Sequence, residues 1–95
     1  MPFEGTTAIV TGGASGIGLA ITEALAARGT SVAMLDVQAD ALDEQVGRLR
    51  DLGRSVSGHV CDVTDRPGVE AAVERVRDEH GVPLILVNNA GKPLF

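Results

Sequence analysis

The sequence predicts an α/β fold: half of a doubly wound parallel sheet, in which four strands alternate with three helices. Short apolar runs alternate along the chain with segments whose apolar residues recur every three or four positions. A glycine follows each helical segment, at Gly29, Gly53 and Gly81. No linker or repeat interrupts the 95 residues, so we expect one domain. Helical crossovers make the strands parallel, and with strands numbered along the chain the expected spatial order is 3-2-1-4.

The four predicted strands differ in their patterns. Residues 7–11 and 31–36 are short, nearly continuous apolar runs, typical of central strands covered on both faces. Residues 55–60 alternate in polarity, which indicates a strand at the edge of the sheet. Residues 84–89 open with the most apolar run of all.

Each predicted helix carries an apolar stripe at helical spacing. The first opens at Ile17, and Thr64 offers an N-cap for the third. The stripes consist of Ile17, Ile21 and Leu25; of Leu42, Val46 and Leu49; and of Val69, Val73 and Val76.

Four glycines fall within seven residues in the stretch TGGASGIG, residues 11–18, between the first strand and the first helix. This place lies beside the switch point between strands 1 and 4, where such sheets bind ligands. We expect Gly12 to form the tight turn, Gly16 to let phosphates approach, and Gly18 to let the helix press on the sheet. The helix start then supplies free N–H groups and positive charge. The spacing G-x-x-x-G-x-G differs from the G-x-G-x-x-G fingerprint, and a glycine-rich turn without a ligand is the alternative.

Asp36 ends the second predicted strand, 18 residues beyond Gly18. An acid at this position can accept hydrogen bonds from the ribose hydroxyls of an adenosine. A 2′-phosphate would meet like charge there, and neither residues 13–15 nor Val37 and Gln38 supply a base. We therefore expect NAD rather than NADP. A turn or helix-capping role is the alternative for Asp36.

Three motifs together resemble the short-chain dehydrogenase/reductase (SDR) family: TGGASGIG, the pair Asp62-Val63, and Asn88-Asn89-Ala90-Gly91. They stand in the family's order and spacing, and the likeness covers the whole chain. The resemblance implies an NAD-binding Rossmann half-domain over residues 1–95.

The resemblance also implies a role for each matching residue. Gly12, Ser15, Gly16, Ile17 and Gly18 would line the pyrophosphate and its ribose. Asp36 would hold the adenosine ribose, and Asp62 and Val63 would flank the adenine, with the carboxylate bonding its exocyclic amine. Asn89, Ala90 and Gly91 would pass the nicotinamide-side ribose, while Asn88 would tie the fourth strand to its neighbours.

The chemistry that the family implies is hydride transfer between the nicotinamide and an alcohol or carbonyl. The family's proton donor is the tyrosine of Tyr-x-x-x-Lys, but this chain has no tyrosine and its single lysine is Lys92. We therefore assign no catalytic residue and expect the chain to be a truncated cofactor-binding part, inactive as it stands.

Three hypotheses follow. The chain is the cofactor-binding part of an NAD-dependent dehydrogenase, a module that binds NAD without turning it over, or a remnant that binds no ligand. Binding of NAD by the 95 residues separates the second from the third. An in-frame Tyr-x-x-x-Lys downstream in the encoding DNA tests the first.

Composition excludes several other classes of protein. The net charge is −5 and the eight basic residues are scattered, so we expect no binding of nucleic acid. No apolar run approaches the length that spans a bilayer, and no secretory signal is visible, so we expect a cytoplasmic protein.

The single cysteine and the two histidines suggest no site of their own. Cys61 has no partner for a disulfide or a metal, so we expect it to pack structurally and expect no metal. We expect His59 and His80 to be solvated or to complement a helix end.

The fourth strand raises the question of self-association. If it lies at the edge of the sheet, its uncharged run of residues 84–87 leaves backbone groups open to pairing with another chain. We therefore expect a homo-oligomer, an exchange of elements between copies, or aggregation through this strand.

Overall fold

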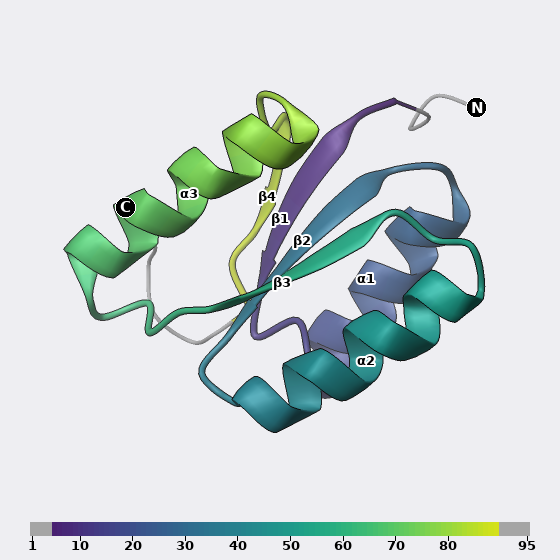
Figure 1. The fold of residues 1–95 in the computed structure, drawn as a ribbon, viewed down its shortest axis with the longest axis horizontal. Helices are drawn as coiled ribbons and strands as arrows, with labels where there is room; N and C mark the ends of the chain where they lie inside the picture. Colours follow the sequence, from purple (N-terminus) through teal and green to yellow (C-terminus); the bar gives the residue numbers. More distant parts are fainter. Residues whose placement is uncertain (1–4, 90–95) are drawn as a thin grey trace.

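A computed structural model describes residues 5–89 of the chain. Strands and helices alternate as the sequence predicts, and Figure 1 traces them in order. The elements are β1 (Thr7–Thr11), α1 (Gly16–Ala27), β2 (Ser31–Asp36), α2 (Ala39–Asp51), β3 (Val56–Val60), α3 (Arg66–His80) and β4 (Ile85–Val87).

The four strands form one parallel sheet in the order β3-β2-β1-β4, which confirms the predicted fold class. Its centre is β1, where Ile9 pairs with Ala33 of β2 on one side and with Leu86 of β4 on the other. The carboxyl ends of all four strands therefore meet along one edge of the sheet.

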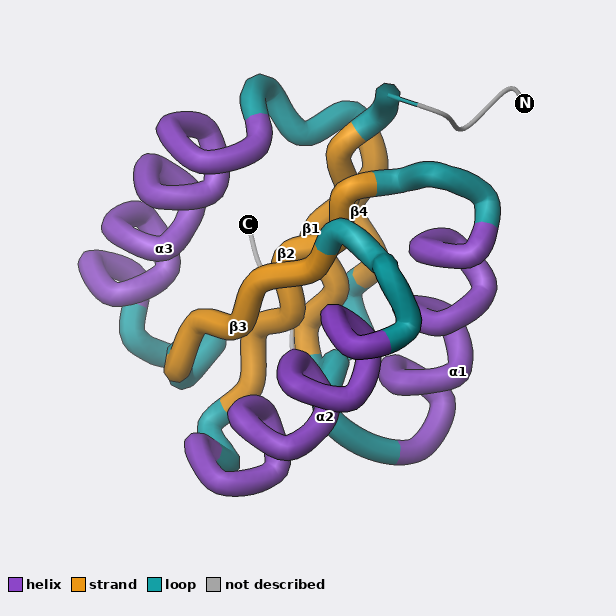
Figure 2. The backbone as a smooth tube through the Cα atoms, turned by 45° about the vertical axis from the view of Figure 1, so that its right-hand side comes forward, coloured by secondary structure: helices purple, strands orange, loops and turns teal. Residues whose placement is uncertain are grey.

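The sheet divides the core into two layers, seen in Figures 1 and 2. Helices α1 and α2 cover one face, and α3 covers the other. Alternate residues of each strand enter the two layers, as the pleat requires. The α1 and α2 layer contains Val10, Val32, Met34, Val56, Leu42, Val46 and Leu49. The α3 layer contains Ile9, Ala33, Leu35, Cys61, Val69, Ala72 and Val76.

The strands match their predicted patterns, except that β3 starts one residue later and β4 is shorter. All of β1 is buried, while β3 alternates along its length as expected of an edge strand. Gly58 of β3 lets α2 pack closely, because a Cβ there would lie 2.9 Å from Cγ2 of Val46.

The stripe predicted for α1 is partly wrong. Ile17 is 71% exposed, and the buried positions are Gly18, Thr22 and Ala26. The close contact at Gly18 fixes the rotation of the helix and turns Ile17 towards solvent. Thr22 tolerates burial because its hydroxyl donates to the Gly18 carbonyl at 2.9 Å.

The start of α3 also differs from the prediction. Asp65, and not Thr64, occupies the N-cap position. Thr64 is engaged elsewhere, because both its N–H and its hydroxyl donate to Oδ1 of Asp62, at 2.9 and 2.7 Å. Along the helix, Ala72 is buried, whereas Val73 is only partly buried. None of the helices within residues 5–89 has the length and apolarity needed to cross a membrane.

Candidate cofactor-binding site

The turn from β1 into α1 requires glycine at two backbone positions. Gly12 and Gly16 have φ angles of +62° and +56°, the left-handed region that other residues rarely adopt. A Cβ added at Gly16 would have no atom within 4 Å, so space lies open above the turn. The turn thus combines backbone that only glycine adopts without strain with an uncovered surface.

Gly18 serves a different purpose, a close approach of the helix to the turn. A Cβ at this position would overlap the carbonyl of Gly12 and lie 2.7 Å from Nδ2 of Asn89. The first turn of α1 therefore packs on the glycine turn and on the end of β4, rather than on the sheet surface in general.

The start of α1 has the properties of an anion site. The first N–H groups of a helix have no partner within it, and here the exposed side chain of Ser15 makes no capping bond. The first turn contains no acidic residue that would compete for the positive end of the helix. Backbone N–H groups, the Ser15 hydroxyl and the helix dipole can thus bind a phosphate.

Asp36 holds the turn from the β2 side. Its Oδ2 accepts the N–H of Ala14 at 3.1 Å and its Oδ1 accepts the N–H of Gln38 at 3.1 Å. The N–H of Gly13 donates to the Leu35 carbonyl at 3.2 Å, which ties the same segment to β2. Asp36 is 7% exposed, and it keeps lone pairs for a further donor.

Thr11 and Asn89 hold the turn from the β4 side. The N–H of Asn89 donates to the Thr11 hydroxyl at 2.8 Å, and its Nδ2 donates to the Gly12 carbonyl at 3.4 Å. The Thr11 hydroxyl in turn lies 3.3 Å from the Val87 carbonyl and 3.4 Å from Oδ1 of Asn88. Asn88 thus links β4 to β1, as predicted.

A pocket of about 270 Å³ adjoins the turn on the β2 and β3 side. This volume lies just below the roughly 300–1,000 Å³ of sites for whole small molecules, and so suits one part of a larger ligand. Aliphatic walls and carboxylates line it together. Its residues are Gly12, Leu35, Asp36, Val37, Cys61, Asp62, Val63 and Thr64.

Two ionisable groups in this pocket have shifted pKa values. The hydrogen bonds from the hydroxyl and then the N–H of Thr64 lower the pKa of Asp62, so it is charged and has one oxygen still open. Burial, followed by the nearby charges of Asp65 and Asp62, raises the pKa of the Cys61 thiol. The pocket therefore presents negative charge and an unreactive thiol.

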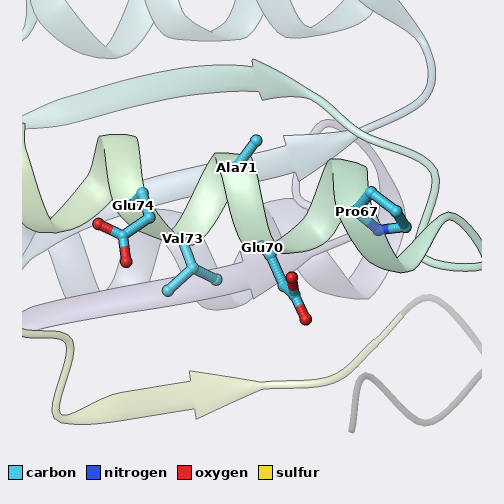
Figure 3. A pocket seen from close by; sticks show the side chains of 5 residues that line it. All are labelled: Pro67, Glu70, Ala71, Val73 and Glu74. Carbon is cyan, nitrogen blue, oxygen red and sulfur yellow. The ribbon is translucent and has the colours of Figure 1, made fainter.

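A second pocket, of about 480 Å³, lies on α3. Figure 3 shows Pro67, Glu70, Ala71, Val73 and Glu74 along it. Two carboxylates line this pocket, and its lining residues include no glycine-rich turn. The glycine turn, with its open helix start, adjoins the pocket on the β2 and β3 side instead.

The structure brings most of the predicted residues together. Gly12, Ser15, Gly16, Ile17 and Gly18 form the turn and helix start, Asp36 and Asn89 flank it, and Asp62 and Val63 line the adjoining pocket. The predicted residues Ala90 and Gly91 lie outside the described residues.

The sequence interpretation missed the bond between Asp36 and Ala14 and the network around Thr11. The threonine that opens TGGASGIG was the one available signal for that network. His59 was also misjudged: it is 4% exposed, and not solvated. Among residues 5–89, no group of three or more His, Cys, Asp or Glu side chains could hold a metal ion.

Comparison with known proteins identifies the family. A family profile described as short chain dehydrogenase matches residues 6–94. The chain belongs to the short-chain dehydrogenase family. It is 45% identical over 92 residues to D-threitol dehydrogenase of Mycolicibacterium smegmatis, covering 94% of this chain and 34% of that protein.

Solved structures of short-chain dehydrogenases share the fold. A citronellol catabolism dehydrogenase of Pseudomonas aeruginosa superimposes with a TM-score of 0.89 at 41% identity, covering 96% of this chain and 38% of that one. An actinorhodin polyketide ketoreductase with NADPH superimposes with a TM-score of 0.87 at 39% identity, covering 93% of this chain and 34% of that one. The chain thus spans about a third of the length of these relatives.

Proposed function

We propose that residues 1–95 are the NAD-binding domain of a short-chain dehydrogenase that transfers hydride between the nicotinamide and an alcohol or carbonyl. One observation carries the proposal: the open glycine turn meets an uncapped helix start beside the pocket that contains Asp36. Family membership supports the reaction class. The nicotinamide supplies the hydride acceptor or donor, and the residues of this chain bind and orient it.

Each part of the site has a proposed partner in the dinucleotide. The pyrophosphate contacts the backbone of the turn and helix start and the Ser15 hydroxyl. The Asp36 carboxylate accepts the adenosine ribose hydroxyls. The open carboxylate oxygen of Asp62 accepts the adenine amine, and Val63 packs on the ring. Asn89, Ala90 and Gly91 pass the nicotinamide-side ribose, and the exposed Ile17 covers the phosphate region.

The charge of the pocket supports NAD over NADP. Asp36 and Asp62 line it, and none of its lining residues is a lysine or arginine. A 2′-phosphate would bring like charge to a buried carboxylate, which is unfavourable. The ketoreductase with NADPH shows that a relative of this fold accommodates the phosphorylated cofactor, so the choice depends on such local residues.

Calorimetric titration of NAD and NADP into the chain tests both claims. We expect NAD to bind at least about tenfold more tightly, a difference of about 1.4 kcal/mol. The variant Asp36→Ala removes the pocket carboxylate. Asp40→Ala is its matched control, because Asp40 is an acid in the first turn of α2 and outside the pocket. Equal affinities for the two cofactors would refute the NAD preference. No detectable binding of either would favour a remnant without a ligand.

Location and assembly extend the proposal. We place the protein in the cytoplasm, which the single free cysteine supports because reducing compartments preserve free thiols. We also infer self-association through β4. Leu84 and Leu86 of this edge are 75% and 46% exposed, and an exposed apolar strand edge favours pairing. Cell fractionation tests the location.

A further inference from the structure

Three polar side chains form a buried cluster between α3 and the edge strand β3, and none of them lines the candidate cofactor-binding pocket. The Ser57 hydroxyl lies 2.9 Å from Nε2 of His59 and 2.7 Å from Nε2 of His80. Ser57 and His59 are 5% and 4% exposed, and the side chain of His80 is 11% exposed. Nδ1 of His59 is buried without a hydrogen-bond partner.

The cluster attaches the last turn of α3 to the sheet. His80 is the final residue of the helix, and the Thr7 hydroxyl of β1 donates to its backbone carbonyl at 3.0 Å. Its side chain reaches β3 through Ser57. Among the described helices, α3 alone covers this face of the sheet (Figures 1 and 2).

The hydrogen bonds of the cluster depend on its protonation state. Where the hydroxyl hydrogen of Ser57 is paired within the cluster, the hydroxyl donates to one imidazole and accepts from the other, because accepting from both would leave that hydrogen unpaired. If His59 donates from Nε2, its Nδ1 is an unpaired acceptor, and His80 accepts at Nε2. If His80 is the donor, His59 must carry its hydrogen on Nδ1, as a buried N–H without a partner. The first arrangement is favoured, because orphaned buried donors are the rarer defect.

An added proton always leaves one buried donor unpaired. On Nδ1 of His59, the proton itself has no partner. A proton on Nε2 of His80 has two possible consequences. Either the Ser57 hydroxyl turns to donate to Nε2 of His59, and the hydrogen of the His59 ring moves to its Nδ1, or the Ser57 hydroxyl hydrogen has no acceptor. Ser57 and His59 are therefore free of an unpaired buried donor only while both imidazoles are neutral.

The surroundings of His59 favour the neutral form. Burial is the main cause that lowers the pKa of His59; Glu79 opposes it, and Arg75 and His80 add to it. These three groups all come from α3, and Oε2 of Glu79 lies 4.0 Å from Nε2 of both histidines. On β2 the register partner of His59 is the apolar Leu35, and the nearest titratable residue along the chain is Cys61.

We propose that Ser57, His59 and His80 form a proton-sensitive clamp that holds the end of α3 on β3 at neutral pH and releases it on acidification. The sign follows from linkage: a pKa lowered in the folded state means that the unfolded chain binds more protons in the window below 6.5. The stabilisation is present above pH 6.5 and is lost as the pH falls through the folded-state pKa.

The tautomers of the unmodified chain give the first test. Long-range ¹H–¹⁵N NMR spectra at pH 7.5 should place the hydrogen of His59 on Nε2 and that of His80 on Nδ1. As the pH falls, the proton taken up by the cluster should change the signals of both rings together. A His59 ring whose hydrogen lies on Nδ1 at pH 7.5, or a change in the His59 signals on acidification that leaves the His80 signals unaltered, would overturn the proposal.

Ser57→Ala gives the second test, with Ser55→Ala as its control, because Ser55 is exposed and its hydroxyl pairs with Ser31 instead. Between pH 7.5 and 5.5 we expect the unfolding equilibrium constant of the unmodified chain and of Ser55→Ala to rise, with about tenfold as the upper limit for one histidine whose pKa is lowered from 6.5. The rise should shrink at least twofold in Ser57→Ala. Equal pH dependence in Ser57→Ala and the unmodified chain would refute the clamp.

Amide hydrogen exchange locates the release. After correction for intrinsic rates, protection at residues 77–80 should fall more on acidification than protection in the last turn of α2. An equal fall in both turns would show that the effect is not local to the clamp, and the proposal would then fail.

Discussion

Oδ2 of Asp36 accepts the backbone N–H of Ala14 at 3.1 Å across 22 positions of sequence. The residue proposed to hold the adenosine ribose thus also fixes the turn proposed to hold the phosphates. Cofactor selection and the shape of the phosphate site are therefore coupled through one carboxylate.

Asp36→Ala should weaken NAD binding and destabilise the fold together. Loss of a charge-assisted bond to the ribose predicts about 10- to 100-fold weaker binding, and the unpaired buried N–H of Ala14 predicts a loss of about 1–3 kcal/mol. Calorimetry and urea unfolding followed by circular dichroism measure the two effects. In Asp40→Ala both values should stay close to those of the unmodified chain; unchanged stability in Asp36→Ala would contradict the coupling.

Gly18→Ala should be destabilising, because its Cβ would overlap the Gly12 carbonyl and crowd Asn89. We expect a loss of about 1–3 kcal/mol in the free energy of unfolding, together with weaker NAD binding. Gly47→Ala is the control, and it should have the opposite effect on stability. Gly47 lies within α2, and a Cβ there would meet no atom within 4 Å. Gly47→Ala should therefore stabilise the chain by about 0.5–1 kcal/mol. Equal effects at the two sites would rule out the close contact at Gly18.

The Cys61 thiol should react slowly with iodoacetamide in the folded chain. Burial and two neighbouring carboxylates raise the pKa of this thiol, so little thiolate forms at pH 8. Mass spectrometry should show much faster labelling in urea. Because Cys61 lines the proposed adenine pocket, NAD should slow the labelling of the folded chain further. Labelling that NAD does not slow would argue against adenine binding there.

Leu86→Lys should reduce self-association if β4 is the pairing edge. Leu86 is 46% exposed on that strand, and a charge on an edge strand disfavours the approach of another strand. Sedimentation velocity at micromolar concentration should show a shift towards monomer. Leu52→Lys provides the control, because Leu52 is 58% exposed at the end of α2, far in sequence from β4. A monomeric unmodified chain would refute association through β4.

Periodicity was sufficient to predict the architecture, and residue type and spacing predicted Gly12 and Asp36 of the pocket. The positions of the strands, the order 3-2-1-4 and the edge position of β3 follow from local patterns and the handedness of crossovers. Asp36 was predicted because it follows a strand, and the carboxyl ends of parallel strands share one edge. Asp62 and Val63 were predicted only from the resemblance to the family. The rotation of α1 was not predictable from its stripe, since Gly18 meets Asn89 only after β4 joins the sheet.

The sequence by itself determined the alternation of elements, the glycines at the turn and the acids at the strand ends, because these depend on residue type and spacing along the chain. Only the tertiary structure decided that Asp36 binds Ala14, that Ile17 faces solvent and that His59 shares Ser57 with His80. The physical reason is that hydrogen bonding and burial depend on atoms brought together by packing, 22 or more positions apart in the pairs Ala14–Asp36 and Ser57–His80.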